Sequence, residues 1–181
     1  MRRRPTGYTL AEMLAVCAVL SIAATVAIPS AAPVAEFQAD AAAGEVELAL
    51  RFARDEALRT GELRMVRCEQ QLNRERVVAR RAFGTILYDS AVQQPGSRQP
   101  YSVPLATTPA GSNATLAGCS FTFSEGASAA DVAFDAKGMP VRGSGDEETR
   151  KQALASGTIV VGIGNTVRTV TVGVTGRVTT S

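Results

Sequence analysis

A single carboxylate lies inside the most apolar stretch of this chain. From Thr9 to Ile28 the sequence has no charged side chain except Glu12. A charge deep in a bilayer costs roughly 2.5–3.5 kcal/mol on insertion scales, and less near a helix end. Because residues four apart are neighbours on a helix, an amine on Tyr8 would be a suitable partner for Glu12. A proteolytic cut after Gly7 would create that amine.

Few other side chains could do covalent or acid–base chemistry. The chain of 181 residues has three cysteines and no histidine. Without histidine there is no Ser-His-Asp or Cys-His nucleophile system, and the commonest metal ligand is missing. The acids and bases form no convergent set along the sequence. The sequence therefore predicts a protein that is not an enzyme, with no cofactor and no metal site.

Cys68 and Cys119 are the two cysteines outside the apolar run, which contains Cys17. Beyond a membrane they would lie in an oxidising compartment, where disulfides form and persist. A bridge between them would stabilise the fold by about 4 kcal/mol in the chain-entropy model. Two free thiols are the alternative, and the sequence leaves both open.

Basic side chains near the C-terminus could contact phosphate. Beyond Glu148 the sequence has four basic residues and no acid. Arginine and lysine bind phosphate without reading base sequence, so DNA binding through Arg168 and Arg177 is one hypothesis. Charge scattered along a solvated strand end is the simpler alternative. The overall charge does not favour a nucleic-acid binder, because loss of the arginines at 2–4 leaves 16 of the 19 basic side chains against 17 acidic ones.

The apolar run has the length of a membrane-spanning helix. About 20 apolar residues in a helix cross the hydrocarbon core of a bilayer, and the arginines at 2–4 favour a cytoplasmic N-terminus. The expected divisions are a leader at 1–7, a transmembrane segment at 8–29, a helix beyond the membrane at 30–61 and a β-rich head at 62–181.

Two other targeting signals compete with this interpretation. A cleaved secretory signal could end at the small residues 30–32, but its apolar region would be shorter and would not contain Glu12. A lipoprotein signal at Cys17 is disfavoured by the bulky Val16 before it. A cut after Gly7, which leaves the apolar helix on the protein, fits better than either.

Between 34 and 60 the sequence predicts a helix that docks on a sheet. An apolar stripe repeats there at helical spacing, and Gly61 is a suitable stop. The stripe consists of Val46, Ala49, Leu50, Ala53 and Ala57, broadened by Leu48 and Phe52. Pro29 and Pro33 predict a bend before it.

After Gly61 the pattern changes to short strands. We expect strands at 63–68, 76–80, 82–88, 101–105, 119–123, 131–134, 158–163 and 167–174, with a long loop over 90–117 and a turn at Gly164-Asn165. In the last strand, valines at 170, 172 and 174 alternate with threonines, as in a half-buried strand. The arginines at 74, 76, 80 and 81 are expected to be partly balanced by Glu69 and Glu75.

The start of the chain resembles the leader of type IV pilins, which usually reads glycine, an aromatic, threonine, leucine, an aliphatic, glutamate and leucines. The matching run is Gly7-Tyr8-Thr9-Leu10-Ala11-Glu12-Met13-Leu14, and Pro29 falls where pilins commonly have a proline. The resemblance implies that prepilin peptidase cuts between Gly7 and Tyr8 and methylates the new Tyr8 amine. It also implies that Glu12 meets the amine of a neighbouring subunit during assembly; pairing with the amine of its own chain is the alternative.

Four shorter motifs resemble the GspH/FimT branch of minor pilins and pseudopilins. They occupy residues 50–57, 83–89, 134–138 and 174–178. The resemblance implies an α+β fold, in which a long N-terminal membrane-spanning helix packs on a globular head of antiparallel β-sheets. Some FimT-like subunits bind DNA through C-terminal arginines in a glycine-arginine motif, and Gly176-Arg177 is similar to the start of that motif.

The function implied by this resemblance is that of a minor pilin, which primes or caps a type IV pilus. A minor pseudopilin H of a type II secretion system is the alternative, because both machines use this leader and helix. The expected location is the bacterial inner membrane, with a single span and the head in the periplasm. The expected partners are prepilin peptidase and other pilins or pseudopilins, contacted through the N-terminal helix, with DNA as a further possibility.

Overall fold

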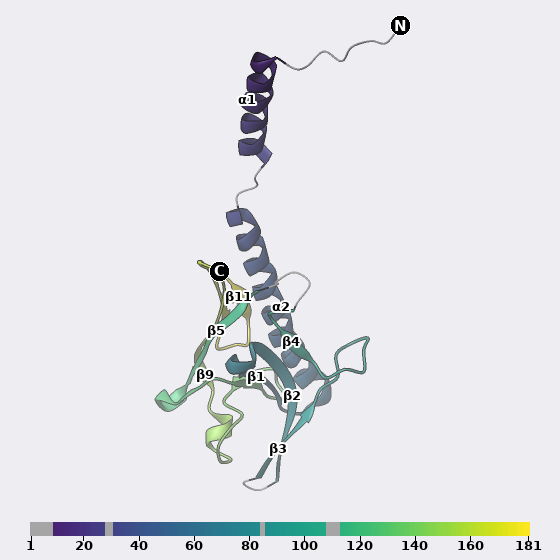
Figure 1. Cartoon of the computed structure of the whole chain (residues 1–181). Helices are drawn as coiled ribbons and strands as arrows, with labels where there is room; N and C mark the ends of the chain where they lie inside the picture. Colours follow the sequence, from purple (N-terminus) through teal and green to yellow (C-terminus); the bar gives the residue numbers. More distant parts are fainter. Residues whose placement is uncertain (1–8, 28–30, 84–85, 108–112) are drawn as a thin grey trace. The chain divides into compact units, whose positions relative to one another are not determined.

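The computed structural model describes residues 9–27, 31–83, 86–107 and 113–181 of the chain (Figure 1). The chain divides into two compact units, Met1–Val34 and Ala35–Ser181. The first contains helix α1 (Leu10–Ala27) and the start of helix α2 (Ala31–Thr60). The second contains the rest of α2 and all the described strands, and we call it the head.

Helix α1 exposes large apolar side chains between Leu10 and Ile22. Leu10, Leu14 and Leu20 are among those that are more than half exposed. Within the described residues, no helix combines the length and the apolarity needed to cross a membrane. The expected transmembrane segment 8–29 includes positions 8, 28 and 29, which lie outside the described residues, and its insertion in a bilayer stays a prediction.

Helix α2 carries the predicted apolar stripe into the core of the head. The fully buried members are Val46, Ala49, Leu50, Ala53 and Ala57, and the stripe extends to Ala39, Ala42 and Ala43. The prediction for Leu48 is wrong, since this side chain is 55% exposed. At 3.6 residues per turn, two positions rotate a side chain by about 200°, so Leu48 points away from the face of Val46 and Leu50. Phe52 is half-buried and stacks on Tyr101, with ring centroids 4.5 Å apart.

The end of α2 lies where the sequence predicts it. Gly61 has a φ of +70°, a left-handed conformation that favours glycine. Its N–H donates to the carbonyl oxygen of Ala57 at 2.9 Å, which satisfies one of the free carbonyl groups of the last turn. The predicted stop is therefore confirmed.

The described strands form two antiparallel sheets, of six and five strands. The first has the order β3-β2-β1-β7-β8, with β4 paired to β2, and the second has the order β11-β10-β9-β5-β6. The first sheet contains β1 (Arg64–Glu69), β2 (Arg74–Phe83), β3 (Ile86–Ala91), β4 (Ser102–Pro104), β7 (Val132–Phe134) and β8 (Pro140–Val141). The second contains β5 (Thr115–Phe123), β6 (Ser128–Ala129), β9 (Leu154–Ile163), β10 (Thr166–Val172) and β11 (Val178–Thr180). Short 3₁₀ turns cover Gln70–Leu72, Ser124–Gly126 and Thr149–Lys151.

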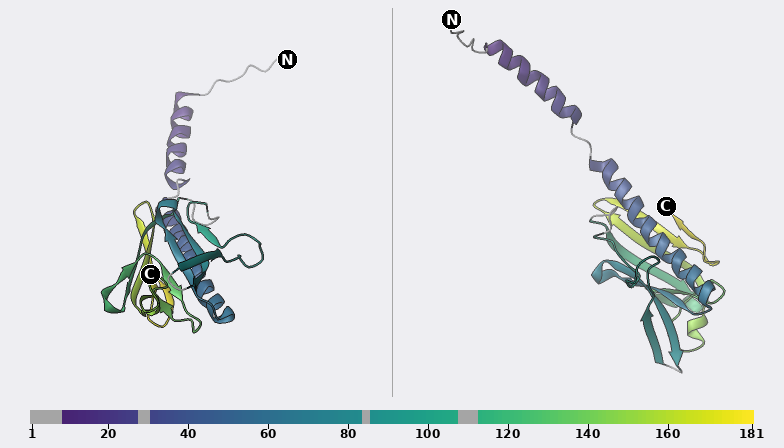
Figure 2. Two further views of the ribbon diagram at one scale, coloured as in Figure 1. Left: turned by 90° about the horizontal axis from the view of Figure 1, so that it is seen from below. Right: turned by 90° about the vertical axis from the view of Figure 1, so that its right-hand side faces the viewer.

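Both sheets and α2 contribute to one hydrophobic core. The right-hand view of Figure 2 shows α2 running along one side of the sheets. Phe121 and Phe123 of β5 and Phe134 of β7 are among the largest fully buried side chains, and they belong to the same cluster as the stripe of α2. The coarse prediction of an N-terminal helical region followed by antiparallel sheets is confirmed.

Several strand boundaries differ from the prediction. The expected strands at 76–80 and 82–88 are replaced by β2 and β3, because β2 continues through Arg80 and Arg81. These two arginines are accommodated by ion pairs with Asp89 and Glu62. The expected loop over 90–117 is too long, since β5 begins at Thr115.

The C-terminal hairpin also departs from the prediction. The turn at Gly164-Asn165 joins β9 to β10 as expected, but β10 ends at Val172. Val174 is exposed rather than inward-facing. Gly176, at a φ of +78°, lies in the connection that leads back into β11, a strand that the sequence did not indicate.

Candidate functional site

Glu12 closes a hydrogen-bonded cap on the first turn of α1. The Glu12 carboxylate accepts from the Thr9 backbone N–H at 3.0 Å and from the Thr9 hydroxyl at 3.1 Å, while the Glu12 N–H donates to the Thr9 hydroxyl oxygen at 3.3 Å. This is a capping box, in which a threonine and a glutamate three residues later satisfy the free donors of a helix start. Both groups are exposed. The Thr-x-x-Glu spacing was visible in the sequence and could have revealed the cap.

The processing residues Gly7 and Tyr8 lie outside the described residues. The pairing of Glu12 with a Tyr8 amine, of its own chain or of a neighbour, therefore stays a prediction. The capping box shows that in the full chain Glu12 already has polar partners at the helix start. The positive end of the helix dipole favours the carboxylate at the same place.

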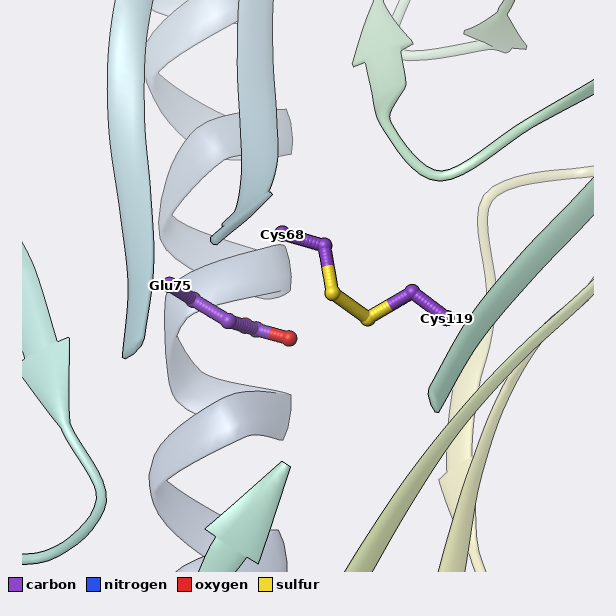
Figure 3. Close-up of side chains that lie close together, drawn as sticks. All are labelled: Cys68, Glu75 and Cys119. Atoms are coloured by element: carbon purple, nitrogen blue, oxygen red, sulfur yellow. A yellow bond between two sulfur atoms is a disulfide. The ribbon is translucent and has the colours of Figure 1, made fainter. Parts of the chain in front are cut away.

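Cys68 and Cys119 are joined by a disulfide, with Cα atoms 6.5 Å apart. Cys68 belongs to β1 of the first sheet and Cys119 to β5 of the second, so the bridge links the two sheets (Figure 3). The sequence left the bridged and the free form open, and it gave no indication that a bridge would connect two sheets. Cys17 of α1 is a free, exposed cysteine.

Side-chain hydrogen bonds hold the turn between β1 and β2 to the start of β5, beside the disulfide. The Asn73 amide, in the turn between β1 and β2, donates to the Ala114 carbonyl at 2.7 Å and accepts from the Leu116 N–H at 2.6 Å. Gln70 of the same turn donates to the Ala117 carbonyl at 2.7 Å. We call the β1–β2 turn, the start of β5 and the disulfide the inter-sheet corner.

Glu75 is fully buried in this corner, and the sequence did not indicate it. Its side chain points toward the two sulfur atoms (Figure 3), and among the described residues neither carboxylate oxygen has a hydrogen-bond partner. Burial raises the pKa of Glu75 from 4.5 to about 8, because an ionised carboxylate is poorly stabilised in an apolar core. The carboxyl group is therefore largely protonated at neutral pH.

The expected role of Glu75 as a partner for nearby arginines is wrong. Glu69 pairs with both Arg74 and Arg76, at 2.5 and 3.3 Å, on the more exposed side of β2. Successive side chains of a strand point to opposite faces, so Glu75 shares the inner face with the buried Val77. This alternation was present in the sequence and could have placed Glu75 inside once the strand was known to begin at Arg74.

Arg168 and Arg177 are not brought together by the fold. Arg168 of β10 forms an ion pair with Asp40 of α2. Arg177 is exposed and lines an open cavity of 590 Å³, together with two other arginines and two acids. Val172 of β10 pairs with Val178 of β11 next to the turn that contains Arg177. Arg168 lies four residues before Val172 in β10, about 13 Å along the strand from that turn.

The charges around Arg177 are mixed. The cavity wall contains Arg51 and Arg54 but also Glu47 and Asp55. Arg51 is paired with Glu47, and Arg54 donates to the Gly138 carbonyl at 3.2 Å. Positive charge is therefore partly neutralised on this face.

Comparisons with known proteins give one structural similarity. No known family model matches the chain, and no curated protein matches it. Among solved structures, the chain is similar to the type IV minor pilin FimU of Pseudomonas aeruginosa, at 15% identity and a TM-score of 0.43, over 79% of this chain and 87% of that one. A similarity at this level does not show the family.

Proposed function

We propose that this chain is a minor pilin, which primes or caps a type IV pilus from the bacterial inner membrane, with its head in the periplasm. The observation that carries the proposal is the position of Glu12. Glu12 lies in the first turn of the exposed apolar helix α1 and caps that helix through Thr9. Thr9 directly follows the Gly7-Tyr8 sequence at which the cut is expected. A separate helix, α2, is built into a head that a disulfide holds together. These features support a subunit with an apolar stem for lateral packing and a stable body.

The chemistry of assembly follows from the cap. Removal of residues 1–7 by prepilin peptidase creates an amine on Tyr8, one residue before Thr9. In the uncut chain the Thr9 N–H and hydroxyl already hold the Glu12 carboxylate at the helix start. The same carboxylate can then accept from a methylated amine, either of its own chain or of a neighbouring subunit. Pairing with the neighbour fixes the axial position at which the new subunit enters the filament.

The proposal is tested by the mass of the mature N-terminus. Coexpression of the full chain with a prepilin peptidase should give a protein that begins at Tyr8 and carries one added methyl group. Gly7→Leu should block the cut, because the residue before the scissile bond becomes bulky. Recovery of the chain with its first seven residues intact, or cut beyond α1, would refute the proposal.

The role of Glu12 is tested separately. Glu12→Gln keeps hydrogen-bonding capacity but removes the negative charge, so we expect the variant to be cut normally and yet to be at least tenfold depleted from sheared filaments. Glu36→Gln makes the same chemical change at an exposed position of α2 and serves as the control. Immunoblots of filament and membrane fractions provide the measurement. Equal incorporation of both variants would show that Glu12 acts only as a helix cap.

The type II secretion alternative is tested by deleting the chain and measuring which process is lost, pilus formation or protein secretion. Deletion of a minor pilin should abolish surface pili and leave secretion of folded proteins across the outer membrane intact. The opposite phenotype, with pili retained and secretion lost, would assign the chain to a type II secretion pseudopilus instead.

Contact with DNA stays a narrower hypothesis. Since Arg168 is held by Asp40 and Arg177 is exposed, we expect Arg177→Gln to weaken a DNA gel shift and Arg168→Gln to leave it unchanged. Contacts to phosphate are salt-dependent, so the shift should also fall steeply as salt is raised. A shift that both single variants leave unchanged would eliminate these arginines as the contact.

A further inference from the structure

Three side chains that could bind a metal ion meet at the inter-sheet corner. The sulfur atoms of Cys68 and Cys119 and a carboxylate oxygen of Glu75 all lie within 4.8 Å of one another (Figure 3). In the disulfide form the sulfur atoms are bonded to each other and are not thiolates. The Glu75 carboxyl is then a fully buried polar group that has no hydrogen-bond partner among the described residues.

The thiol form of the same corner has different chemistry. Every newly made chain carries thiols before its disulfide is formed, and a thiol or phosphine reductant restores them. Such a reductant supplies two electrons and is itself oxidised; the S–S bond breaks, and each sulfur takes up one proton from water. The product has two free sulfur ligands beside the unpartnered carboxyl of Glu75.

We propose that the thiol form of this chain binds one thiophilic divalent cation, such as Zn²⁺, through Cys68, Cys119 and Glu75, with water at the fourth position. Zinc takes thiolate and carboxylate ligands in a tetrahedral arrangement, with Zn–S near 2.3 Å and Zn–O near 2.0–2.2 Å. Ligand atoms in such a site are about 3.5–3.8 Å apart. Once the S–S bond is broken, the two sulfur atoms must move apart by about 1.7 Å to reach this spacing. The Glu75 carboxylate oxygen already lies within 4.8 Å of both.

The surrounding structure holds the ligands in place without the disulfide. Cys68 and Glu75 are directly opposite each other in the β1–β2 register. Cys119 comes from β5, whose start is held to the β1–β2 turn by the hydrogen bonds of Asn73 and Gln70. Because these bonds do not depend on the sulfur atoms, breaking the S–S bond leaves Cys119 beside the other two ligands.

The donor set selects the kind of cation. Two thiolates and one carboxylate suit zinc and related transition metals, whereas Ca²⁺ and Mg²⁺ require an all-oxygen shell. Direct coordination to the cation gives the buried carboxylate a positive neighbour, which it lacks in the disulfide form. Both cysteines are only half-buried, which leaves a route for the ion from solvent.

Metal binding and disulfide formation are mutually exclusive. On binding, the two thiols and the carboxyl group release their protons to water, and the three deprotonated groups coordinate the ion. A coordinated thiolate pair cannot form the S–S bond until the ion leaves. The site thus belongs to the chain before its oxidation and holds the two sheets together at the point where the disulfide later links them.

The test uses Co²⁺, which replaces Zn²⁺ and has visible absorption. The full chain with Cys17→Ser, which leaves only the two corner thiols, is reduced with a phosphine under anaerobic conditions and titrated with Co²⁺. We expect one equivalent to bind, with a sulfur-to-cobalt charge-transfer band and the strong d–d bands of tetrahedral cobalt. Excess Zn²⁺ should bleach both, and the oxidised chain should show neither.

Two variants distinguish the built site from a pair of loose thiols. Glu75→Gln should weaken Co²⁺ binding at least tenfold, whereas Glu69→Gln, the same change at the residue next to Cys68 on the opposite face of β1, should not. Zn²⁺ should raise the unfolding temperature of the reduced chain, since it binds the folded form, and the rise should be lost in Glu75→Gln.

Several outcomes would overturn the proposal. An absence of cobalt bands in the reduced chain would do so directly. Equal affinity of the Glu75→Gln variant and its parent for Co²⁺ would show that the two thiols bind the ion without Glu75. If the reduced chain is unfolded by circular dichroism, Zn²⁺ should restore the folded spectrum, and failure to restore it would equally refute the site.

Discussion

Replacement of Glu75 by glutamine is expected to stabilise the disulfide-linked protein at neutral and alkaline pH and to have little effect in acid. The Glu75 carboxyl is fully buried, its oxygens have no hydrogen-bond partner in the described part of the chain, and burial raises its pKa from 4.5 to about 8. Such a group binds its proton more tightly in the folded than in the unfolded protein. Glutamine resembles the protonated acid but cannot ionise.

The sign of the pH dependence follows from this raised pKa. Below pH 4.5 the carboxyl is protonated in both states, so ionisation has no effect on the free energy of unfolding. Between pH 4.5 and about 8 the unfolded chain loses the proton while the folded protein keeps it. The parent protein therefore loses about 1.4 kcal/mol of stability per pH unit across this window. The total loss is about 5 kcal/mol, and above it both states are ionised and the curve levels off.

Neighbouring groups do not reverse this expectation. The Tyr101 phenol has its pKa raised above 10, first by burial and then by the charges of Glu45 and Glu75, so it does not ionise within the window. The two sulfur atoms nearest to Glu75 are in the disulfide and do not titrate.

Chemical denaturation of both proteins at a series of pH values measures the effect. The free energy of unfolding of Glu75→Gln minus that of its parent should increase from near zero at pH 4.5 to several kcal/mol at pH 8. Glu148→Gln, at an exposed position, controls for removal of one surface carboxylate. Parallel curves for the parent and Glu75→Gln over this range would mean that water or a cation reaches the carboxyl.

Loss of the Cys68–Cys119 bridge is the second large effect that we expect. The bridge joins residues 51 positions apart and links two sheets that are also paired at an isolated bridge between Val141 of β8 and Ala153, directly before β9. In the chain-entropy model a loop of this length stabilises the folded state by about 4 kcal/mol, by restricting the unfolded chain. That is a large fraction of the 5–15 kcal/mol typical of a folded domain.

Denaturant unfolding of Cys119→Ser should show a loss of about 4 kcal/mol. Reduction of the parent protein in the absence of metal should give the same loss, because both treatments remove the same link. Cys17→Ser, at the exposed cysteine of α1, should change stability by less than about 0.5 kcal/mol. A loss below about 1 kcal/mol in Cys119→Ser would show that the hydrogen bonds of Asn73 and Gln70 are sufficient to hold the corner.

The two effects should also be coupled. Glu75 lies within 4.8 Å of both sulfur atoms, and changes at residues in contact are rarely additive. Removal of the bridge by Cys119→Ser replaces the two bonded sulfur atoms beside the carboxyl with a thiol and a hydroxyl, both of which can donate a hydrogen bond to it. We therefore expect Glu75→Gln to stabilise the Cys119→Ser protein less at pH 8 than it stabilises the bridged one.

Local chemistry explains the parts of the structure that the sequence predicted well. The stripe from Val46 to Ala57 depends only on helical spacing, and all five of its members are buried. The stop at Gly61 and the turn at Gly164 depend on the conformational freedom of single residues, and both have positive φ. The Thr9–Glu12 cap belongs to the same class, since both partners lie within one helical turn. The Thr-x-x-Glu spacing of this cap is present in the sequence, next to the Tyr8 amine that a cut after Gly7 would create as another partner for Glu12.

Errors arose where distant segments decide the outcome. The pairing of Arg168 with Asp40 spans 128 positions, and it removes one of the two arginines proposed for DNA from free contact with phosphate. Strand β11 is short and becomes a strand only by pairing with β10.

The sequence by itself determined the apolar stem with its acid at the fifth position after the expected cut, the helix that follows it, and most of the strands. These features depend on spacings of two to four residues, which the chain carries wherever it folds. The tertiary structure decided that the two cysteines bridge separate sheets and that Glu75 lies beside them without a partner. The physical reason is that burial and charge pairing depend on which strands meet, and β1, β2 and β5 meet only when the complete head is assembled.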